Sequence, residues 1–411
     1  MPHTSTAARN RLALLVALGV DNFGSGLFLP LLVVYAVRVV GIPLGLAGTV
    51  ISIGTLAGLA VPPSAGRLVD RWGPRPVVVT SQLLQAAGAC TFLLADGIIF
   101  TLVASMLLAA GQQTFYSSLF ALIADVAGPG PKDRPYAVVG MVRAAMFGSG
   151  ALVTAVALVD SGDRGLRIAV AVNAVSFLAA ALLLWVFVHP DRHDSSVESA
   201  PDAMTVLHNR PYLALIGVTC LLALALDFFL VGLPVFVLEV TTGPSWLPGV
   251  SLALLTVVTS TSATLALRAT GHLTRTTAMS VGAAIFICWC ALCAVTPALP
   301  TVARPAWVIA TTLLLAAGAL MFGTRVNALA EAAAPSATRG RHLAAFQYAF
   351  TVAGVLTPAI VALFSVSRWV PFAIVAAAAS VGAAALPTLS RHLPAHAVHG
   401  HEPQKLPLAA G

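Results

Sequence analysis

The sequence predicts an all-α membrane protein with twelve transmembrane helices, arranged as two bundles of six. Three observations support this prediction. Of the 411 residues, 58% are hydrophobic and 9% are charged, whereas soluble domains are about 45–50% apolar and about 25% charged. The apolar residues gather in runs that are long enough to cross a bilayer core of about 30 Å. One long polar interval, 189–210, separates these runs into two equal sets.

The spans follow from the length of each apolar run, since a transmembrane helix needs roughly 20 residues. The first run is about 26 residues long, which exceeds the apolar core of a cleavable signal peptide, so we expect it to be retained. Only Asp96 and Gly97 separate the third run from the fourth. The predicted spans are 12–37, 45–65, 76–95, 97–124, 137–159, 165–188, 211–237, 248–268, 275–296, 305–330, 342–364 and 369–388.

The positions of Lys and Arg orient these spans. With the N-terminus in the cytoplasm, 17 of the 22 basic residues lie on the cytoplasmic side, as the positive-inside rule requires. The net charge of +7 is therefore explained without a nucleic-acid partner. We expect a multi-pass protein of the plasma membrane, the inner membrane of a bacterium, with both termini cytoplasmic. Its predicted units are an N-terminal bundle (1–188), a cytoplasmic central loop (189–210), a C-terminal bundle (211–388) and a cytoplasmic tail (389–411).

Other patterns argue against an enzyme. The chain has no Gly-rich phosphate loop, no HExxH helix and no Ser-His-Asp set near the surface, so we predict no catalytic residue. Cys288, Cys290 and Cys293 lie close together, but all are inside an apolar run. Cysteines in such places behave as small buried apolar residues. We therefore expect no metal site and no cofactor.

Short similarities relate the two halves of the chain. Asp21 in the first span is followed by a glycine and a proline, and Asp227 in the seventh span is followed in the same way. Duplicated six-helix halves with a binding site near the bilayer midplane are a known plan of secondary transporters. The repeat therefore points to transport.

A charge-rich segment lies between the second and third spans, where we expect a very short loop at the cytoplasmic surface. It reads Gly66-Arg67-Leu68-Val69-Asp70-Arg71-Trp72-Gly73-Pro74-Arg75. This segment resembles the G-x-L-x-D-R-x-G-x-R signature of the major facilitator superfamily, and within that superfamily the chain resembles the twelve-span drug:H⁺ antiporters. The resemblance implies two bundles that rock around a central cavity, and export of a small lipophilic molecule in exchange for protons.

The same resemblance implies a gate on the cytoplasmic side. Gly66 and Gly73 permit tight backbone at the two ends of the segment. Asp70 would meet the start of the eleventh span, and Arg71 and Arg75 could pair with Asp125 at the end of the fourth. The alternative is that these charges only set the topology of the chain.

Two carboxyl groups inside spans are candidates for carrying the coupled proton. Asp21 lies about ten residues into its span, where a charge costs about 2.5–3.5 kcal/mol on insertion scales. It should therefore face the cavity, and Asp227 is the second candidate. The alternative is a neutral Asp that is hydrogen-bonded between helices. Arg143, near the start of the fifth span, could extend to the cytoplasmic surface or pair with Asp125.

Polar and aromatic side chains within the spans are candidates for the substrate cavity. They are Asn22, Ser25, Gln113, Tyr116, Phe228 and Gln347. Amides, hydroxyls and rings suit a largely apolar molecule that is neutral or cationic. The alternative is hydrogen bonding between helices, which is common for polar side chains in spans.

The expected partners are a small-molecule substrate, protons and the lipid bilayer, and we expect a monomer. Two other functions stay open at this point. The first is uptake, or facilitation without proton coupling, of a small metabolite. The second is a membrane sensor or enzyme that kept the fold without transporting. The sequence alone does not give the direction of transport.

Overall fold

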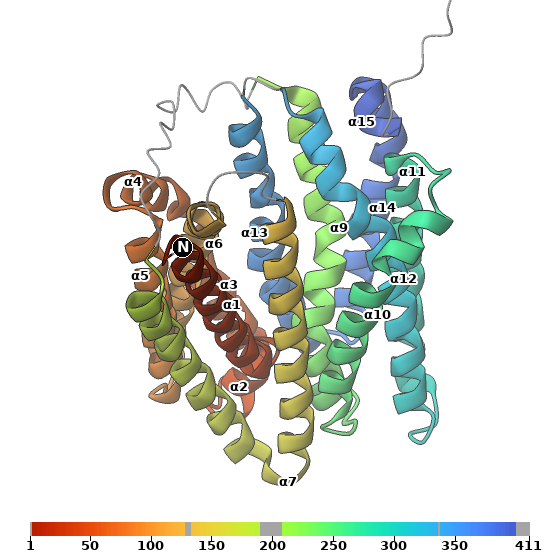
Figure 1. Ribbon diagram of the computed structural model, residues 1–411. Helices are drawn as coiled ribbons and strands as arrows, with labels where there is room; N and C mark the ends of the chain where they lie inside the picture. Colours follow the sequence, from red (N-terminus) through yellow and green to blue (C-terminus); the bar gives the residue numbers. More distant parts are fainter. Residues whose placement is uncertain (1, 128–132, 190–207, 336–337, 400–411) are drawn as a thin grey trace, which may run out of the picture.

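The computed structural model describes residues 2–127, 133–189, 208–335 and 338–399. These residues form helices joined by short turns (Figure 1). In the first half of the chain, the main helices are α1 (Pro2–Phe28), α2 (Leu32–Arg38), α3 (Leu44–Leu56), α4 (Pro62–Trp72), α5 (Pro74–Leu93), α6 (Ile98–Ala127) and α7 (Asp133–Phe187). Short 3-10 turns, η1 (Leu29–Leu31) and η2 (Ala57–Ala60), continue α1 into α2 and extend α3.

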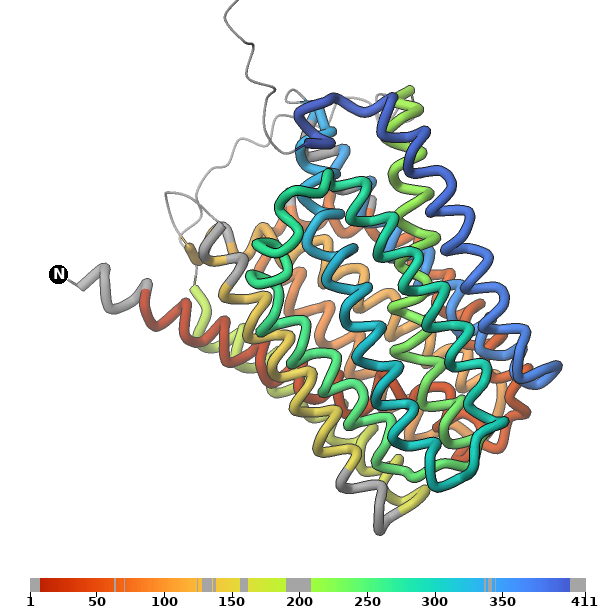
Figure 2. Tube along the Cα trace, turned by 90° about the vertical axis from the view of Figure 1, so that its right-hand side faces the viewer, coloured from red at the N-terminus to blue at the C-terminus, as the bar shows by residue number. Residues whose placement is uncertain are grey.

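The second half repeats this pattern of long helices. They are α9 (Arg210–Val235), α10 (Leu247–Ala269), α11 (Arg275–Val295), α12 (Arg304–Ala333), α13 (Arg339–Ala362), α14 (Val370–His392) and the short α15 (Ala395–His399). A π-helical turn, η3 (Phe236–Val240), ends α9, and the 3-10 turns η4 (Thr296–Ala298) and η6 (Leu363–Ser365) end α11 and α13. Figure 2 shows α10, α11 and α12 running side by side along one face.

Eleven helices of the described residues are long and apolar enough to cross a membrane. The remaining predicted span, 45–65, corresponds to a shorter apolar helix, Leu44–Ala60. The boundary predicted at Asp96 and Gly97 is confirmed, because α5 ends at Leu93 and α6 begins at Ile98. The fifth and sixth spans are the two arms of α7, which reverses at Gly162 with a positive φ of 48°.

The predicted short loop at 66–76 is wrong, because this segment belongs mostly to a helix. α4 begins at Pro62, where the missing N–H of proline is tolerated in the first turn of a helix, and runs to Trp72. Gly73 then adopts a φ of 85°, a left-handed conformation that glycine enters without steric cost, and α5 begins at once. The predicted end of the second span, at residue 65, is therefore several residues too late.

The predicted cytoplasmic tail also begins with ordered structure. α14 continues to His392, and α15 packs against α12. His396 Nε2 lies 3.0 Å from the carbonyl oxygen of Ala332, and Arg275 Nη1 donates to the carbonyl of Ala397 at 2.8 Å. These contacts fix the end of the described chain to the second half.

The two halves meet through helices that carry small residues. α3 packs against α13, where an added Cβ at Gly48 would lie 2.2 Å from the Pro358 carbonyl oxygen. Ser52 donates a hydrogen bond to the Val355 carbonyl at 2.7 Å. The first arm of α7 packs against α10 in a similar way, with Gly249 against the backbone of Ala151. Small residues let helix backbones approach closely inside a membrane.

One ion pair joins the halves at the end of the spans that we predict to be extracellular. Arg38 at the end of α2 contacts Glu239 in η3, with 2.5 Å between Nε and Oε1. Arg38 also donates to the Leu238 carbonyl at 3.1 Å. The contacts between the halves named here thus extend from this end to about the middle of the spans.

Candidate functional site

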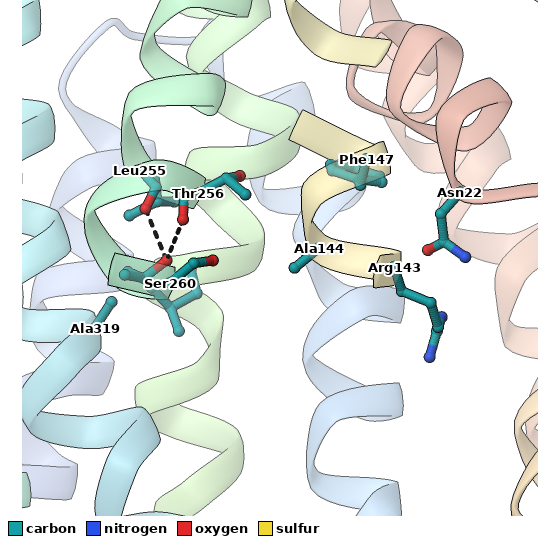
Figure 3. Close-up of a pocket in the computed structure, with 10 residues that line it drawn as sticks. Asn22, Arg143, Ala144, Phe147, Leu255, Thr256, Ser260 and Ala319 are labelled. Carbon is teal, nitrogen blue, oxygen red and sulfur yellow. Dashed lines mark hydrogen bonds between the residues drawn. The ribbon is translucent and has the colours of Figure 1, made fainter. Parts of the chain in front are cut away.

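A cavity of about 420 Å³ lies between the two halves of the molecule. Small-molecule sites have volumes of about 300–1,000 Å³, so the cavity has the size of such a site. Its lining comes from α1, α7, α9, α10 and α12 and comprises Asn22, Arg143, Ala144, Phe147, Leu226, Leu255, Thr256, Thr259, Ser260 and Ala319 (Figure 3). Half of these residues are polar and half are apolar.

Arg143 is the one charged residue of this lining. Arg143 lies ten residues, or about 15 Å, from the start of α7 at Asp133, and its side chain is directed at α6. Its Nη2 donates to the Tyr116 hydroxyl at 2.9 Å, and its guanidinium lies over the rings of Tyr116 and Phe115, at 5.1 and 5.4 Å. Its Nε is buried without a hydrogen-bond partner among the described residues.

Asp21 lies on α1, one residue before Asn22, which lines the cavity together with Arg143. Its side chain is 5% exposed, and its Oδ2 accepts a hydrogen bond of 3.2 Å from Asn22 Nδ2, which also donates to the Leu18 carbonyl. Arg143 is the basic group whose charge acts on Asp21. Close packing of α1 on α7 brings them together, since an added Cβ at Gly26 would lie 2.0 Å from the Phe147 carbonyl oxygen.

Asp227 holds the corresponding place in the second half, on α9. Its side chain is half-buried and makes no hydrogen bond within the described residues. It follows Leu226, which lines the cavity, but Asp227 itself is not among the lining residues. The two predicted proton carriers are therefore not equivalent, because only Asp21 has an arginine and an amide beside it.

The structure brings some of the predicted cavity residues to this site and leaves others out. Asn22 lines the cavity, and Tyr116 contacts Arg143. Phe228 instead lies in a buried aromatic cluster of the second half, with ring centroids 5.4 Å from Phe372 and 5.9 Å from Phe364. The remaining predicted residues, Ser25, Gln113 and Gln347, do not line this cavity.

Three hydroxyl residues of the lining, all on α10, are missing from the prediction. Thr256 and Thr259 donate their hydroxyl hydrogens to the Leu252 and Leu255 carbonyls, at 2.9 and 2.7 Å. Their oxygens can therefore only accept hydrogen bonds from a ligand. Ser260 adds a hydroxyl on the same wall, as Figure 3 shows. The signal was available, since hydroxyl residues recur at i, i+3 and i+4 within an apolar run.

The signature residues lie at the cytoplasmic end that we predict from the charges. Arg71 is exposed and has no partner among the described residues. Arg75 donates to the carbonyls of Leu184 and Trp185 and stacks on the Trp185 ring at 5.1 Å. The suggested pair between Arg75 and Asp125 is therefore not present. The structure describes the backbone of Asp70 within α4 but not its side chain.

The architecture of two helical halves around a central cavity is that of a membrane transporter. A comparison with models of protein families supports this. The model of the Major Facilitator Superfamily matches residues 14–358. The chain therefore belongs to the Major Facilitator Superfamily, which confirms the family, the fold class and the expectation of a transporter rather than an enzyme. No curated relative matches the sequence.

Several solved transporter structures share the fold. A mutant of the nucleoside transporter NupG superposes with a TM-score of 0.76 at 14% identity, covering 92% of this chain and 99% of that one. A bacterial homologue of the iron transporter ferroportin, in an inward-facing state, gives 0.72 at 16% identity, covering 93% and 99%. A mutant of the peptide transporter POT gives 0.73 at 13% identity, covering 93% and 95%. At this identity the similarity extends to the fold alone.

Proposed function

We propose that this protein is a proton-coupled secondary transporter that moves a small molecule across the bacterial inner membrane, by export if the proton is exchanged for the substrate and by uptake if the two are co-transported. The observation that supports it best is the cavity between the halves with Asp21, Asn22, Arg143 and Tyr116 at one side. A buried carboxyl next to an arginine can change its charge when the cavity gains or loses water. Half of the lining residues are apolar, which suits a substrate with an apolar body.

Transport in this proposal proceeds by alternating access. The N-terminal bundle (1–188) and the C-terminal bundle (211–388) rock about the contacts between α3 and α13 and between α7 and α10. The contacts between the halves at Arg38 and Ser52 lie outward of the cavity, so this conformation presents the cavity to the cytoplasmic side. The signature residues Gly66, Asp70, Arg71, Gly73 and Arg75, with Asp125, would form the inner latch of the opposite conformation.

Two modes of proton coupling fit this proposal. In exchange, which the resemblance to drug antiporters implies, substrate and proton compete for Asp21. In co-transport, which also permits uptake, substrate and proton bind together. Arg143 favours co-transport, because a cation cannot approach Asp21 without approaching Arg143 as well. We assign the carrier role to Asp21 first and to Asp227 second.

Everted membrane vesicles test the proposal. Candidate compounds, including lipophilic dyes, would be offered with and without an imposed pH gradient, and with the wild-type chain or Asp21→Asn. We expect wild-type flux to depend on the gradient and Asp21→Asn to transport downhill only. Asp96→Asn is the matched control, since this exposed carboxyl lies in the turn between α5 and α6. Gradient-driven flux that survives Asp21→Asn would assign the proton to another group, with Asp227→Asn as the next variant.

A further inference from the structure

The charges around the cavity restrict what it can bind. Arg143 brings one positive charge to the lining, and the lining contains no carboxylate. Asp21 is buried behind the lining, and Asp227 lies outside it. An organic cation would therefore face Arg143 without a compensating group at the cavity surface, which is costly in a medium of low dielectric constant.

Arg143 has N–H groups without a hydrogen-bond partner among the described residues. Its Nη2 is occupied by Tyr116, its Nε has no partner, and its Nη1 makes no hydrogen bond to any described residue. Figure 3 shows its side chain and that of Asn22 next to each other at one side of the cavity. A planar guanidinium with free N–H groups matches the geometry of a carboxylate or another oxyanion.

On the opposite wall, two of the three hydroxyl groups have the reverse chemistry. The hydroxyl hydrogens of Thr256 and Thr259 are used within α10, so these side chains offer acceptor oxygens to the cavity. A ligand group facing this wall should be a donor, such as a hydroxyl or an N–H group. The apolar part of the lining includes Phe147, on the same helix as Arg143, and Leu226.

We infer that the substrate is a small organic acid, with its anionic group at Arg143, an apolar middle and a hydrogen-bond donor facing Thr256 and Thr259. This inference rests on the proposed proton-coupled transport and specifies its substrate class. Asp21 then acts as an internal competitor of the substrate, because its negative charge repels a bound anion and attracts Arg143. Protonation of Asp21 removes this competition, so that proton and anion bind together and move in the same direction.

Three probes with one ring and one hydroxyl separate the charge classes: 4-hydroxybenzenesulfonate is an anion, 4-hydroxybenzenesulfonamide is neutral and tyramine is a cation. Their binding to the purified full-length protein would be measured by calorimetry in nanodiscs of uncharged lipid. We expect the sulfonate to bind about tenfold more tightly than the sulfonamide, as a charge-assisted hydrogen bond allows, and tyramine to bind most weakly. Equal or tighter binding of tyramine, or no binding of the sulfonate, would overturn the inference.

Substitutions at Arg143 and Asp21 test whether Arg143 causes the expected order of the three affinities. Arg143→Gln should remove the preference for the sulfonate while leaving sulfonamide binding within about twofold, and Arg143→Lys should keep part of it. Asp21→Asn should bind the sulfonate more tightly than the wild type does, because the competing charge is gone. A preference that survives Arg143→Gln contradicts the assignment. If that variant does not fold, the ranking in the wild type and in Asp21→Asn decides.

The vesicle assay separates this inference from the proposed function. Proton-coupled flux of an amine would support the proposed transporter function and contradict the inference that the substrate is an organic acid. Sulfonate binding without any proton-dependent flux would support the inferred class of ligand and contradict the proposed proton coupling.

Discussion

Arg38 and Glu239, which are 201 positions apart in the sequence, form an ion pair of 2.5 Å that joins the two halves at one end of the spans. The pair is partly exposed, and the Leu238 carbonyl accepts a second hydrogen bond from the same arginine. It lies outward of the cavity, next to the contact between α3 and α13. In the proposed orientation, the pair therefore favours the conformation in which the outer side is closed.

Breaking this pair should shift the balance between the two conformations. Partly exposed ion pairs contribute about 0.2–1 kcal/mol, so Glu239→Gln should change the ratio of inward- to outward-open molecules by roughly 1.4- to 5-fold. Distance distributions between spin labels on the outer ends of α2 and α9 would measure the ratio. The exchange Arg38→Glu with Glu239→Arg should restore it. An unchanged ratio in the single variant would mean that the pair does not hold the outer side closed.

A side chain at Gly48 should disturb the contact between α3 and α13. Its Cβ would meet the Pro358 carbonyl oxygen at 2.2 Å and the Ala362 Cβ at 2.7 Å, and overpacking typically costs about 1–3 kcal/mol. We expect Gly48→Val to lower the melting temperature of the purified protein and to slow transport. Gly354→Ala on α13 is the matched control, since a Cβ there meets nothing within 4 Å. Equal effects of the two variants would argue against a specific contact at Gly48.

The two arginines that follow Asp70 should differ in their effect on stability. Arg75 binds two carbonyls at the end of α7 and stacks on Trp185, whereas Arg71 is exposed. Loss of hydrogen bonds from a charged group costs about 1.5–3 kcal/mol when buried, and the partial exposure of Arg75 reduces this to about 1 kcal/mol. Arg75→Ala should therefore lower the melting temperature, and Arg71→Ala should not. The reverse order would contradict the contacts described for Arg75.

The proposed role of Asp70 in the inner latch can be tested by measuring transport. If it belongs to the inner latch, Asp70→Asn should reduce transport by the reconstituted protein without a matching loss of folded protein. The latch would form only when the cytoplasmic side is closed. Binding of ligand from the cytoplasmic side uses the opposite conformation, so it should persist in Asp70→Asn. Undiminished transport by Asp70→Asn would leave this residue as a determinant of topology only.

Phe228 should contribute to stability rather than to substrate binding. It is 1% exposed and packs among Trp289, Phe364 and Phe372. Truncation of such a residue costs about 3–5 kcal/mol, so Phe228→Ala should unfold at a markedly lower temperature than Phe228→Leu. The affinity of folded Phe228→Leu for ligand should equal that of the wild type. A loss of ligand affinity in Phe228→Leu at unchanged stability would instead indicate that Phe228 contacts the ligand.

Apolar run length and the signature were sufficient to predict the fold. Hydrophobicity locates spans reliably, because a bilayer admits helices only when every backbone group is satisfied internally. The ends of spans were predicted less well, as 45–65 shows. There the proline that starts α4 lies within the apolar run, and hydrophobicity alone gives no sign of the change from one helix to the next.

The candidate site was predicted in part. Asp21 and Asn22 were found because polar groups are rare and costly at that depth. For Arg143 two alternatives were left open, extension to the cytoplasmic surface or a pair with Asp125, and the contact of its guanidinium with Phe115 and Tyr116 was not predicted. Phe228 was misplaced, because its side of α9 cannot be read from an almost uniformly apolar helix. Thr256 and Thr259 were missed, although their spacing of three residues within an apolar run places them on one face of a helix.

The reversal of α7 at Gly162 has a mechanical consequence. The first arm of this helix carries Arg143 at the cavity, and Arg75 contacts Trp185 near the end of the second arm. The two arms meet at Gly162, so a displacement of one arm moves the start of the other. In the proposed transport cycle, a shift of the first arm at the cavity would therefore be transmitted through the second arm to Arg75 in the signature segment.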